Sequence, residues 1–334
     1  MTAIKWLLIG AGDIAGRRVA PALVAAPHSR LTAVCDLAAA RATELAAEHD
    51  VNRVYTDTAQ ALAESGADAV YIATPQATHV GLCLQALDAG KHFLCEKPLG
   101  LNGAECRRLL AAARRSDRIT SCSNYRRLSE QYKATAAMLE RQEIGRLAGG
   151  WAVYSAPFYN PGKSPIRRAL GSSRIKELGF YLIDIVHNFF GMPVSVMAQA
   201  STLNRAVMND VDDIATVVLI FPAGELFTLV FSCHSPGTRH ELELFGTQGR
   251  IYWPEWPPHG NGPVLKIMRA GTEAIAAATA SNCHLPMIID FVAAVRGGRE
   301  PVCTLESAVK TEVITDAVFR AIESGRREPV EWTE

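Results

Sequence analysis

The sequence lacks the features that mark membrane-spanning, nucleic-acid-binding and metal-binding proteins. No segment reaches the roughly 18 consecutive apolar residues that a transmembrane helix needs. Charge of one sign is not in excess, because 34 Lys and Arg residues balance 34 Asp and Glu residues. This balance argues against a basic surface for nucleic acid or anionic lipid. The His and Cys residues show no metal-ligand spacing, so no metal site is expected. Near-zero net charge gives little protection against self-association, which favours an oligomer.

Paired cysteines are also missing. The eight cysteines are scattered along 334 residues without a CxxC pair. A chain of this length does not need disulfides to hold its core, and buried thiols are typical of a reducing compartment. The N-terminus shows neither the basic region nor the apolar stretch of a secretion signal. We therefore expect a cytoplasmic protein.

What the first third of the chain does contain is an alternation of short apolar segments with helical patterns. Strand-like segments include Lys5–Ile9, Leu31–Cys35 and Ala69–Ala73, and helical patterns such as Gln76–Ala89 lie between them. Apolar strands that alternate with helices indicate an α/β fold with a doubly wound parallel sheet. Pro21 is expected to kink or shorten the first helix, because it lacks an N–H and crowds the preceding turn.

The pattern changes from about Trp151, where strands begin to follow one another across short turns. Examples are Ile214–Phe221 and Glu225–Ser232, and helices flank such strands, which indicates an α+β region with an antiparallel sheet. The chain is longer than single cores usually grow, so two domains are expected. We place the first over residues 1–123 and the second over residues 124–334.

A glycine-rich turn follows the first strand. The segment from Gly10 to Gly16 reads GAGDIAG, which is GxGxxG between a strand and a helix. In dinucleotide-binding proteins these glycines permit a tight turn, close approach of the backbone to the pyrophosphate, and close helix–strand packing. The phosphates lie at the positive end of the helix. The predicted cofactor-binding residues here are Gly10, Gly12, Asp13 and Ile14.

An acidic residue stands where the ribose of such a cofactor would lie. Asp36 ends the second strand, 20 residues after Gly16, and its carboxylate can accept hydrogen bonds from ribose hydroxyls. A carboxylate also repels the 2′-phosphate of NADP, and Leu37 and Ala38 offer no cation to bind one. Arg41 lies one turn further on and weakens that argument. We predict a Rossmann domain that binds NAD rather than NADP; the alternative is an unrelated turn followed by a surface aspartate.

Two further segments are more specific than the glycine turn. They read YIATPQATH (Tyr71–His79) and GKHFLCEKP (Gly90–Pro98). They resemble the glucose–fructose oxidoreductase / inositol dehydrogenase / MocA (Gfo/Idh/MocA) family, in which a strand ends in Thr-Pro and the fifth strand ends in Glu-Lys-Pro. The resemblance covers nearly the whole chain, as far as Trp332. It implies an open, mostly antiparallel sheet in the second domain, activity on sugars, cyclitols or related polyols, and homo-dimers or homo-tetramers formed through that sheet.

The resemblance also assigns site residues, most of them in or near the first domain. Lys97 precedes a proline at a strand end and would point into the crevice where doubly wound sheets bind ligands. We predict it as a catalytic residue that hydrogen-bonds the reacting hydroxyl, against the alternative of a solvated loop residue. Arg126 is predicted to bind substrate. The further predicted cofactor-binding residues are Thr74, Pro75, His79, Glu96, Lys97, Asn124 and Arg167.

In its second domain the family carries Asp-x-Gly-x-His with another Asp three residues further on. Alignment on Gly179 and Gly191 puts Glu177 in place of the first Asp, Tyr181 in place of the His, and Asp184 at the last position. Branches that resemble glucose–fructose oxidoreductase and the dihydrodiol dehydrogenases carry Tyr there. We therefore predict Tyr181 as the catalytic acid/base and Glu177 as the residue that orients the substrate.

A tyrosine with an ordinary pKa of about 10 needs a nearby cation to act near neutral pH, and Lys97 would supply it. Tyr181 would then remove the hydroxyl proton while a hydride leaves the same carbon. His187, among apolar neighbours, reads as a satisfied helix histidine rather than a catalytic group. Asp184 either contacts substrate or holds its helix. Aromatic residues of the second domain either stack on a sugar ring or anchor loops: Tyr154, Phe158, Tyr159, Trp253 and Trp256.

Three classes of function fit these residues. The first is a dehydrogenase or ketoreductase for a sugar, cyclitol or amino-sugar. The second is a redox-neutral glycosidase that retains NAD, and the third is a non-catalytic regulator that binds the dinucleotide. Lys97 and Tyr181 favour an enzyme over a regulator, because binding alone does not require an acid/base.

Overall fold

The computed structural model describes residues 3–156, 175–204, 212–234, 237–256, 262–277 and 281–332, with only the backbone of residues 177 and 178. The chain forms two compact units. They consist of Met1–Tyr125 with Ala280–Val309, and of Arg126–Thr279 with Lys310–Glu334. The predicted division into 1–123 and 124–334 had placed the segment Ala280–Val309 in the second domain. Sequence order alone gives no sign that the chain crosses back into its first unit.

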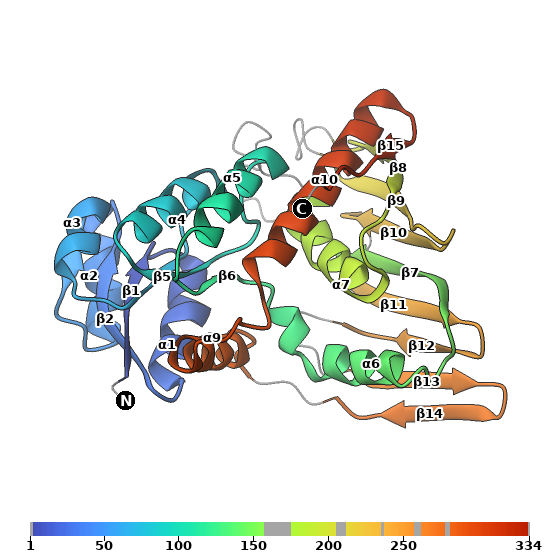
Figure 1. The fold of residues 1–334 in the computed structure, drawn as a ribbon, viewed down its shortest axis with the longest axis horizontal. Helices are drawn as coiled ribbons and strands as arrows, with labels where there is room; N and C mark the ends of the chain where they lie inside the picture. Colours follow the sequence, from blue (N-terminus) through green and yellow to red (C-terminus); the bar gives the residue numbers. More distant parts are fainter. Residues whose placement is uncertain are drawn as a thin grey trace. The chain divides into compact units, whose positions relative to one another are not determined.

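The first unit is built on a six-stranded sheet in which every neighbouring pair is parallel (Figure 1). Its strands are β1 (Ile4–Ile9), β2 (Ser29–Cys35), β3 (Val54–Tyr55), β4 (Ala69–Ile72), β5 (His92–Cys95) and β6 (Thr120–Cys122). Their order across the sheet is β3-β2-β1-β4-β5-β6, which is the order of dinucleotide-binding folds. Strand β4 is buried along its whole length, as expected where helices cover both faces. The predicted doubly wound fold is confirmed.

Helices connect these strands, and one further helix, α9 (Leu285–Gly297), belongs to the later segment of the unit. The connecting helices are η1 (Ala15–Val19), α1 (Ala20–Ala25), α2 (Ala39–Glu48), α3 (Thr58–Glu64), η2 (Gln76–Thr78), α4 (His79–Asp88) and α5 (Gly103–Arg114). The first helix is divided into a wide π-helical turn, η1, and the short α1, with Pro21 in the first turn of α1. A proline is tolerated there because the first N–H groups of a helix have no partner in the helix. Helix α3 was not predicted, although Asp57 caps it by accepting a hydrogen bond from the Gln60 N–H.

The second unit contains a nine-stranded sheet of order β14-β13-β12-β11-β7-β10-β9-β8-β15. The strands are β7 (Leu147–Ser155), β8 (Ser195–Ser201), β9 (Ile214–Ile220), β10 (Leu226–Ser232), β11 (Arg239–Gly246), β12 (Gly249–Trp253), β13 (Val264–Met268), β14 (Gly271–Ile275) and β15 (Glu328–Pro329). Strands β7 and β10 are parallel and the other neighbours are antiparallel. The predicted mostly antiparallel sheet is therefore confirmed.

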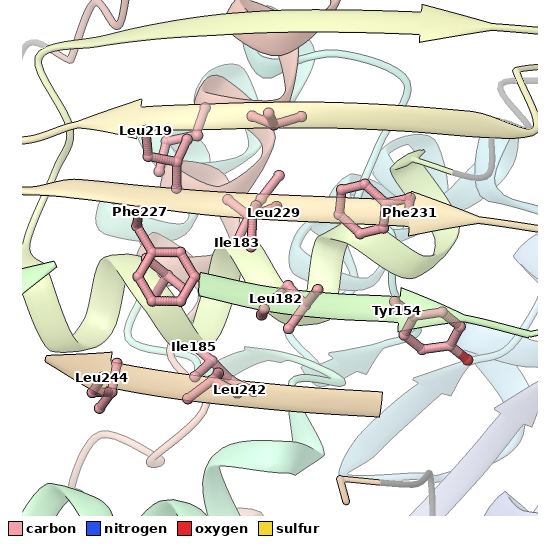
Figure 2. Close-up of a cluster of buried hydrophobic side chains, with 14 of the residues drawn as sticks. Tyr154, Leu182, Ile183, Ile185, Leu219, Phe227, Leu229, Phe231, Leu242 and Leu244 are labelled. Atoms are coloured by element: carbon pink, nitrogen blue, oxygen red, sulfur yellow. The ribbon is translucent and has the colours of Figure 1, made fainter. Parts of the chain in front are cut away.

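Among the described residues, helices pack against one face of this sheet, and the side chains of the other face are more exposed. The remaining helices are η3 (Tyr125–Leu128), α6 (Glu130–Glu140), η5 (Ile175–Gly179), α7 (Phe180–Phe190) and α10 (Leu305–Ser324). Figure 2 shows Leu182 and Ile185 of α7 in the buried cluster with Leu229 of β10. Along β9, Val217 is buried and Thr216 is exposed, because successive side chains of a strand point to opposite faces. The sheet is open on the face that carries Thr216.

Strand β7, in the middle of this sheet, was not predicted. It contains Gly149 and Gly150, which give no apolar signal and ordinarily weaken a strand. A Cβ at Gly150 would clash with the Glu243 carbonyl oxygen of β11, so the close strand pairing here requires glycine. Gly150 therefore interrupts the apolar pattern by which the strand could have been predicted, and it also allows the close pairing of β7 with β11.

Candidate active site

The glycine-rich turn lies at the carboxyl end of β1. Gly10 has φ of +98°, and a Cβ there would lie 2.5 Å from the carbonyl oxygen of Ala73, just after β4. Only glycine permits both this backbone conformation and this close approach. A Cβ on Gly12, by contrast, would meet nothing within 4 Å. The open space over Gly12 is where the dinucleotide motif places a pyrophosphate.

A cavity of about 640 Å³ adjoins this turn. Five residues predicted to bind the cofactor line it: Gly10, Gly12, Asp36, Thr74 and Pro75. The other lining residues include Leu37, Ala38, Arg41, Thr78 and Leu82. The volume lies within the range of cofactor sites, and the mixture of apolar side chains with one carboxylate suits an adenosine moiety. These residues fit NAD.

Asp36 has a second role that the sequence did not reveal. Its Oδ2 accepts a hydrogen bond from the Ala11 N–H at 2.7 Å, and its Oδ1 accepts one from the Ala38 N–H at 2.8 Å. The carboxylate thus holds the glycine turn in place. Each carboxylate oxygen can accept about two hydrogen bonds, so capacity for ribose hydroxyls remains.

We expect Asp36→Asn to move the cofactor preference toward NADP. The amide removes the charge that repels a 2′-phosphate but keeps an oxygen that can accept a backbone hydrogen bond. We expect kcat/KM for NAD to fall about 10- to 100-fold, in line with about 1.5–3 kcal/mol for a hydrogen bond to a charged group. We expect kcat/KM for NADP to rise. Steady-state kinetics with both cofactors measure the change, and Asp88→Asn, an exposed aspartate at the end of α4, is the control. An unchanged NAD-to-NADP ratio would remove Asp36 from cofactor selection.

His79, the histidine of the Thr-Pro segment, connects two loops. Its Nδ1 and Nε2 lie 2.8 Å from the carbonyl oxygens of Pro98 and Thr74, respectively. The side chain is 1% exposed and is not among the residues that line the cavity. Burial lowers its pKa, although both carbonyl contacts oppose that shift. The arrangement makes His79 a residue that positions the loops after β4 and β5.

Glu96 and Lys97 follow β5 directly. The buried carboxylate of Glu96 accepts hydrogen bonds from the Tyr71 hydroxyl at 2.7 Å and from the Lys97 backbone N–H at 3.2 Å. Lys97 is half-buried at the carboxyl end of the parallel strands, where doubly wound sheets bind their ligands. Glu96 therefore holds the backbone of the residue predicted to act in catalysis.

A histidine from the returning segment completes this group. His284 lies before α9, and its Nε2 is 3.0 Å from Oε1 of Glu96. Burial raises the pKa of Glu96, but the hydrogen bond and charge of His284, with the Tyr71 hydroxyl, outweigh it and lower the pKa to about 2. Burial likewise lowers the pKa of His284, but Cys283 and Glu96 outweigh it and raise the pKa to about 9. The two side chains form a buried ion pair.

This ion pair predicts a pH-dependent contribution to stability. The lowered pKa of Glu96 stabilises the fold above its ordinary value of 4.5 and is lost as the pH falls through about 2. The raised pKa of His284 stabilises the fold below its ordinary value of 6.5 and is lost as the pH rises through about 9. The pair is thus most stabilising between pH 4.5 and 6.5.

We expect His284→Gln to lower the free energy of unfolding at pH 6 by about 3 kcal/mol, because one partner of a buried ion pair is removed. The difference from wild type should shrink above pH 9, where His284 is neutral in both folded and unfolded protein. Denaturant unfolding at both pH values measures it. His49→Gln, at the end of α2, is the control. A difference that stays constant with pH would contradict the ion pair.

In the second unit, Tyr181 lies in the first turn of α7. The Arg126 guanidinium lies 4.6 Å from the centre of the Tyr181 ring and 4.5 Å from that of the Trp256 ring. Arg126 also donates a hydrogen bond from Nη1 to the Trp256 carbonyl oxygen at 3.1 Å. A buried cation thus stacks on the predicted acid/base. The structure brings together Arg126 and Tyr181, which the sequence had singled out separately.

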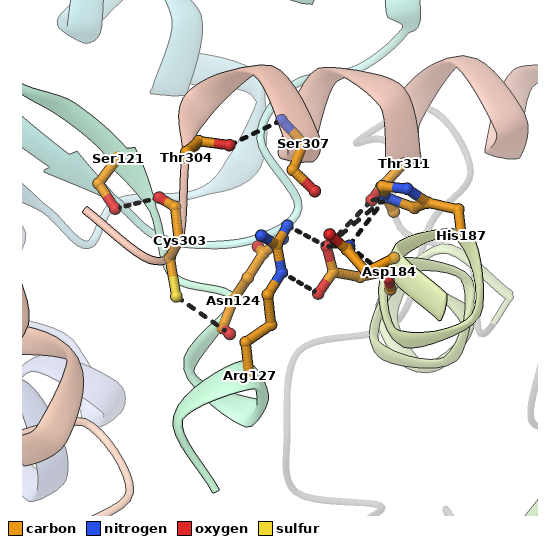
Figure 3. Close-up of polar contacts among 10 residues, drawn as sticks. Ser121, Asn124, Arg127, Asp184, His187, Cys303, Thr304, Ser307 and Thr311 are labelled. Atoms are coloured by element: carbon orange, nitrogen blue, oxygen red, sulfur yellow. Dashed lines mark hydrogen bonds and ion pairs between the residues drawn. The ribbon is translucent and has the colours of Figure 1, made fainter. Parts of the chain in front are cut away.

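Asp184 lies further along α7 in a polar network of its own (Figure 3). Its carboxylate accepts two hydrogen bonds from the Arg127 guanidinium, at 3.0 and 2.8 Å, and both side chains are buried. His187 Nε2 lies 3.0 Å from the Thr311 hydroxyl of α10. These contacts favour the helix-holding alternative for Asp184 and a satisfied helix histidine for His187. Arg127 was not predicted from the sequence. A carboxylate on an otherwise apolar helix was a signal for it, because a buried charge needs a partner of opposite charge.

The other predicted residues lie in several settings. Asp13 is exposed and forms an ion pair with Arg17 at 2.6 Å, and Ile14 precedes η1. Asn124 is buried, and its carbonyl oxygen accepts a hydrogen bond from the Cys303 thiol at 3.3 Å. The predicted residues outside the described positions are Arg167, Phe158, Tyr159 and the side chain of Glu177. Tyr154, Trp253 and Trp256 belong to the buried cluster.

None of the described helices combines the length and the apolar composition of a membrane-spanning segment. Nor do three or more His, Cys, Asp or Glu residues gather in the described parts of the chain as a metal site would require. All eight cysteines lie within these parts, as thiols rather than disulfides.

Comparison with known proteins gives matches over both units. Residues 4–124 match the family described as an oxidoreductase family with an NAD-binding Rossmann fold, and residues 132–252 match the GFO/IDH/MocA C-terminal domain. A dTDP-3,4-didehydro-2,6-dideoxy-alpha-D-glucose 3-reductase of Streptomyces antibioticus is 30% identical, over 88% of this chain and 89% of its own length. A trans-1,2-dihydrobenzene-1,2-diol dehydrogenase of Sus scrofa is 28% identical, over 77% and 76%.

Among solved structures, levoglucosan dehydrogenase in complex with NADH and L-sorbose superposes with a TM-score of 0.89. The superposition covers 100% of both chains at 18% identity. At this level of identity the likeness shows a shared fold.

Proposed function

Because this chain belongs to the Gfo/Idh/MocA oxidoreductase family, we propose that it transfers a hydride between NAD and a hydroxyl or ketone of a sugar, cyclitol or amino-sugar. The cofactor is NAD, as the family of residues 4–124 indicates. The chemistry of the named relatives supports the substrate class. The Streptomyces antibioticus reductase reduces a ketone of a nucleotide-linked deoxysugar, and the Sus scrofa dehydrogenase oxidises a cyclic diol. Levoglucosan dehydrogenase is bound to NADH and a ketose, L-sorbose.

The observation that carries the proposal is the environment of Lys97. Its backbone is held by Glu96 directly after β5, at the ligand-binding edge of the parallel sheet. An ammonium there hydrogen-bonds the reacting oxygen and stabilises the negative charge that develops on it. NAD, when bound, supplies the hydride acceptor for oxidation. Gly10, Gly12 and Asp36 would hold it, with Thr74 and Pro75.

Tyr181 is the proposed acid/base. In oxidation its phenolic oxygen takes the hydroxyl proton, and in reduction it returns a proton to the same oxygen. The guanidinium of Arg126 against its ring favours negative charge on the phenol. Glu177, two residues after the start of η5, would orient the substrate through neighbouring hydroxyls. Lys97 and Tyr181 thus have separate tasks, charge stabilisation and proton transfer.

The first test is NADH absorbance during incubation of the protein and NAD with a panel of sugars, cyclitols and amino-sugars. We expect a substrate-dependent rise at 340 nm, the NADH band, for at least one class. No rise across the panel or with the corresponding ketones and NADH, together with tight retention of NAD, would overturn the proposal. Such a result would favour the redox-neutral glycosidase or the regulator.

We also propose that two or four copies of the chain associate through the open face of the second unit's sheet. Met197 and Leu226 are about half exposed there, and Val218 of β9, which pairs with Met197, is half-buried on the same face. A contiguous apolar patch on an exposed sheet face is typical of a protein–protein interface. Light scattering should give a dimer or tetramer mass, which Met197→Asp should lower. Such an assembly in the cytoplasm agrees with the eight cysteines being thiols.

A further inference from the structure

Three aromatic rings contact one another near Tyr181, on the helix-covered face of the second unit's sheet. They belong to Tyr154 at the end of β7, His240 near the start of β11, and Trp256 after β12. The ring centres of Tyr154 and His240 are 4.2 Å apart, those of Tyr154 and Trp256 5.4 Å, and those of His240 and Trp256 5.5 Å. All three side chains are buried. Arg126 joins this aromatic cluster to Tyr181, because its guanidinium contacts both the Trp256 and the Tyr181 rings.

Two polar atoms of the aromatic cluster are buried and have no hydrogen-bond partner among the residues that the structure describes. They are Nε1 of Trp256, which is 1% exposed, and Nε2 of His240, which is 7% exposed. The carbonyl oxygen of His240 accepts a hydrogen bond from the Trp256 backbone N–H, so the backbone is satisfied while the side chains are not. A buried polar group without a partner destabilises a protein. Two such atoms in one aromatic cluster therefore need a functional or structural explanation.

A second buried tryptophan shows the contrast. Trp253, at the end of β12, is also 1% exposed, but its Nε1 donates a hydrogen bond to the Thr135 hydroxyl at 2.9 Å. Trp6, in the core of the first unit, also has an indole N–H with no partner in the described part of the chain. A lone indole N–H is therefore not sufficient evidence of a ligand. The aromatic cluster differs from Trp6 because it contains a second buried polar atom without a described partner, and because Arg126 contacts both the Trp256 ring and the ring of the proposed acid/base Tyr181.

We propose that Trp256 and His240 form a substrate subsite, in which Nε1 of Trp256 and Nε2 of His240 bind a pair of hydroxyl groups on a sugar or cyclitol. The subsite rests on the proposed function and narrows its substrate class. An indole N–H can only donate, so its ligand atom must be an acceptor oxygen. A neutral hydroxyl supplies that oxygen and can also donate to, or accept from, an imidazole nitrogen.

The charges around the cluster exclude a protonated amine at this subsite. The guanidinium of Arg126 lies 4.5 Å from the Trp256 ring and repels a second cation. Burial, with the charge of Arg126, lowers the pKa of His240 to about 4, so the imidazole is neutral near pH 7. Neither side chain of the subsite supplies negative charge. A neutral hydroxyl therefore fits these two atoms, and the ammonium of an amino-sugar does not.

Trp256→Phe tests the subsite, because it removes the N–H and keeps an aromatic ring. We expect KM for a hydroxylated substrate to rise about three- to tenfold, the loss of one hydrogen bond, with kcat within about twofold. The melting temperature of the ligand-free protein should fall less than that of Trp253→Phe, because both variants lose the same ring volume but only Trp253 loses a hydrogen bond within the protein. His240→Phe should act in the same direction.

Trp253→Phe is the matched control. It removes an N–H that already has a protein partner, so we expect a lower melting temperature and an unchanged KM. Trp6→Phe removes an N–H without a described partner in the first unit; it should lower the melting temperature, because the smaller ring leaves a cavity in the core, and should leave KM unchanged. A Trp256→Phe variant that melts as low as Trp253→Phe and keeps the wild-type KM would overturn the subsite, since that is the behaviour expected of a structural tryptophan.

A binding measurement separates this inference from the proposed function. Melting temperatures of the NAD-loaded protein are recorded with D-glucose, myo-inositol and D-glucosamine. We expect a rise with a neutral polyol that Trp256→Phe removes and Trp253→Phe keeps. Such a rise without any NADH formation would support the subsite and count against the dehydrogenase. No rise with any neutral polyol, or a rise with D-glucosamine alone, would overturn the subsite.

Discussion

Replacement of Lys97 by Ala should lower kcat about 100- to 1,000-fold while the protein still binds NAD. The expected loss is that of a preorganised donor at an oxygen that gains negative charge during reaction. The cavity beside Asp36 does not include Lys97, so the Kd for NAD should change by less than about threefold. Steady-state kinetics and a fluorescence titration with NADH measure the two quantities.

Lys91→Ala is the matched control for this variant. Lys91 precedes β5 and Lys97 follows it, so the two lysines stand at opposite ends of one strand. Lys91 donates a hydrogen bond to the Ala67 carbonyl oxygen at 2.8 Å, and its loss should affect stability rather than kcat. A Lys97→Ala enzyme that retained more than about a tenth of wild-type kcat would contradict a catalytic role for Lys97.

Tyr181→Phe should lower kcat about 100- to 10,000-fold with little change in KM. The substitution removes the one hydroxyl proposed to carry the proton, and general acid–base catalysis contributes about that factor. The ring that stacks on Arg126 remains, so the packing at the start of α7 should be kept. Initial rates in both directions, with melting temperatures of both proteins, measure the effect.

A tyrosine on the open face of the sheet provides the comparison. The Tyr252 hydroxyl donates a hydrogen bond to Glu241 at 2.8 Å, away from the aromatic cluster, and Tyr252→Phe should leave kcat within about twofold. If Tyr181→Phe kept kcat within about threefold of wild type, the acid/base would have to be sought elsewhere. His187, whose ring already contacts the Thr311 hydroxyl, would be the next residue to replace.

The parts of the fold that the sequence predicted well are those that local pattern controls. Strands such as β1 and β5 are short apolar runs bounded by turns, and the glycine turn follows β1 directly. Helix α10 begins and ends at the predicted residues Leu305 and Ser324, because its apolar face repeats at the helical period. Where local signals conflicted, as in the glycines of β7, the element was missed although it lies in the middle of its sheet.

The sequence by itself determined the family, the parallel and antiparallel sheets, the glycine turn with Asp36, and the choice of Lys97 and Tyr181 as predicted catalytic residues. These predictions depend on residue types at short spacing along the chain, and such spacing can be read directly from the sequence. Only the tertiary structure decided that His284 pairs with Glu96, 188 residues away, and that the indole N–H of Trp256 has no partner among the described residues. Such contacts join distant segments, and the free energy of a buried polar atom depends on which neighbours the fold brings to it.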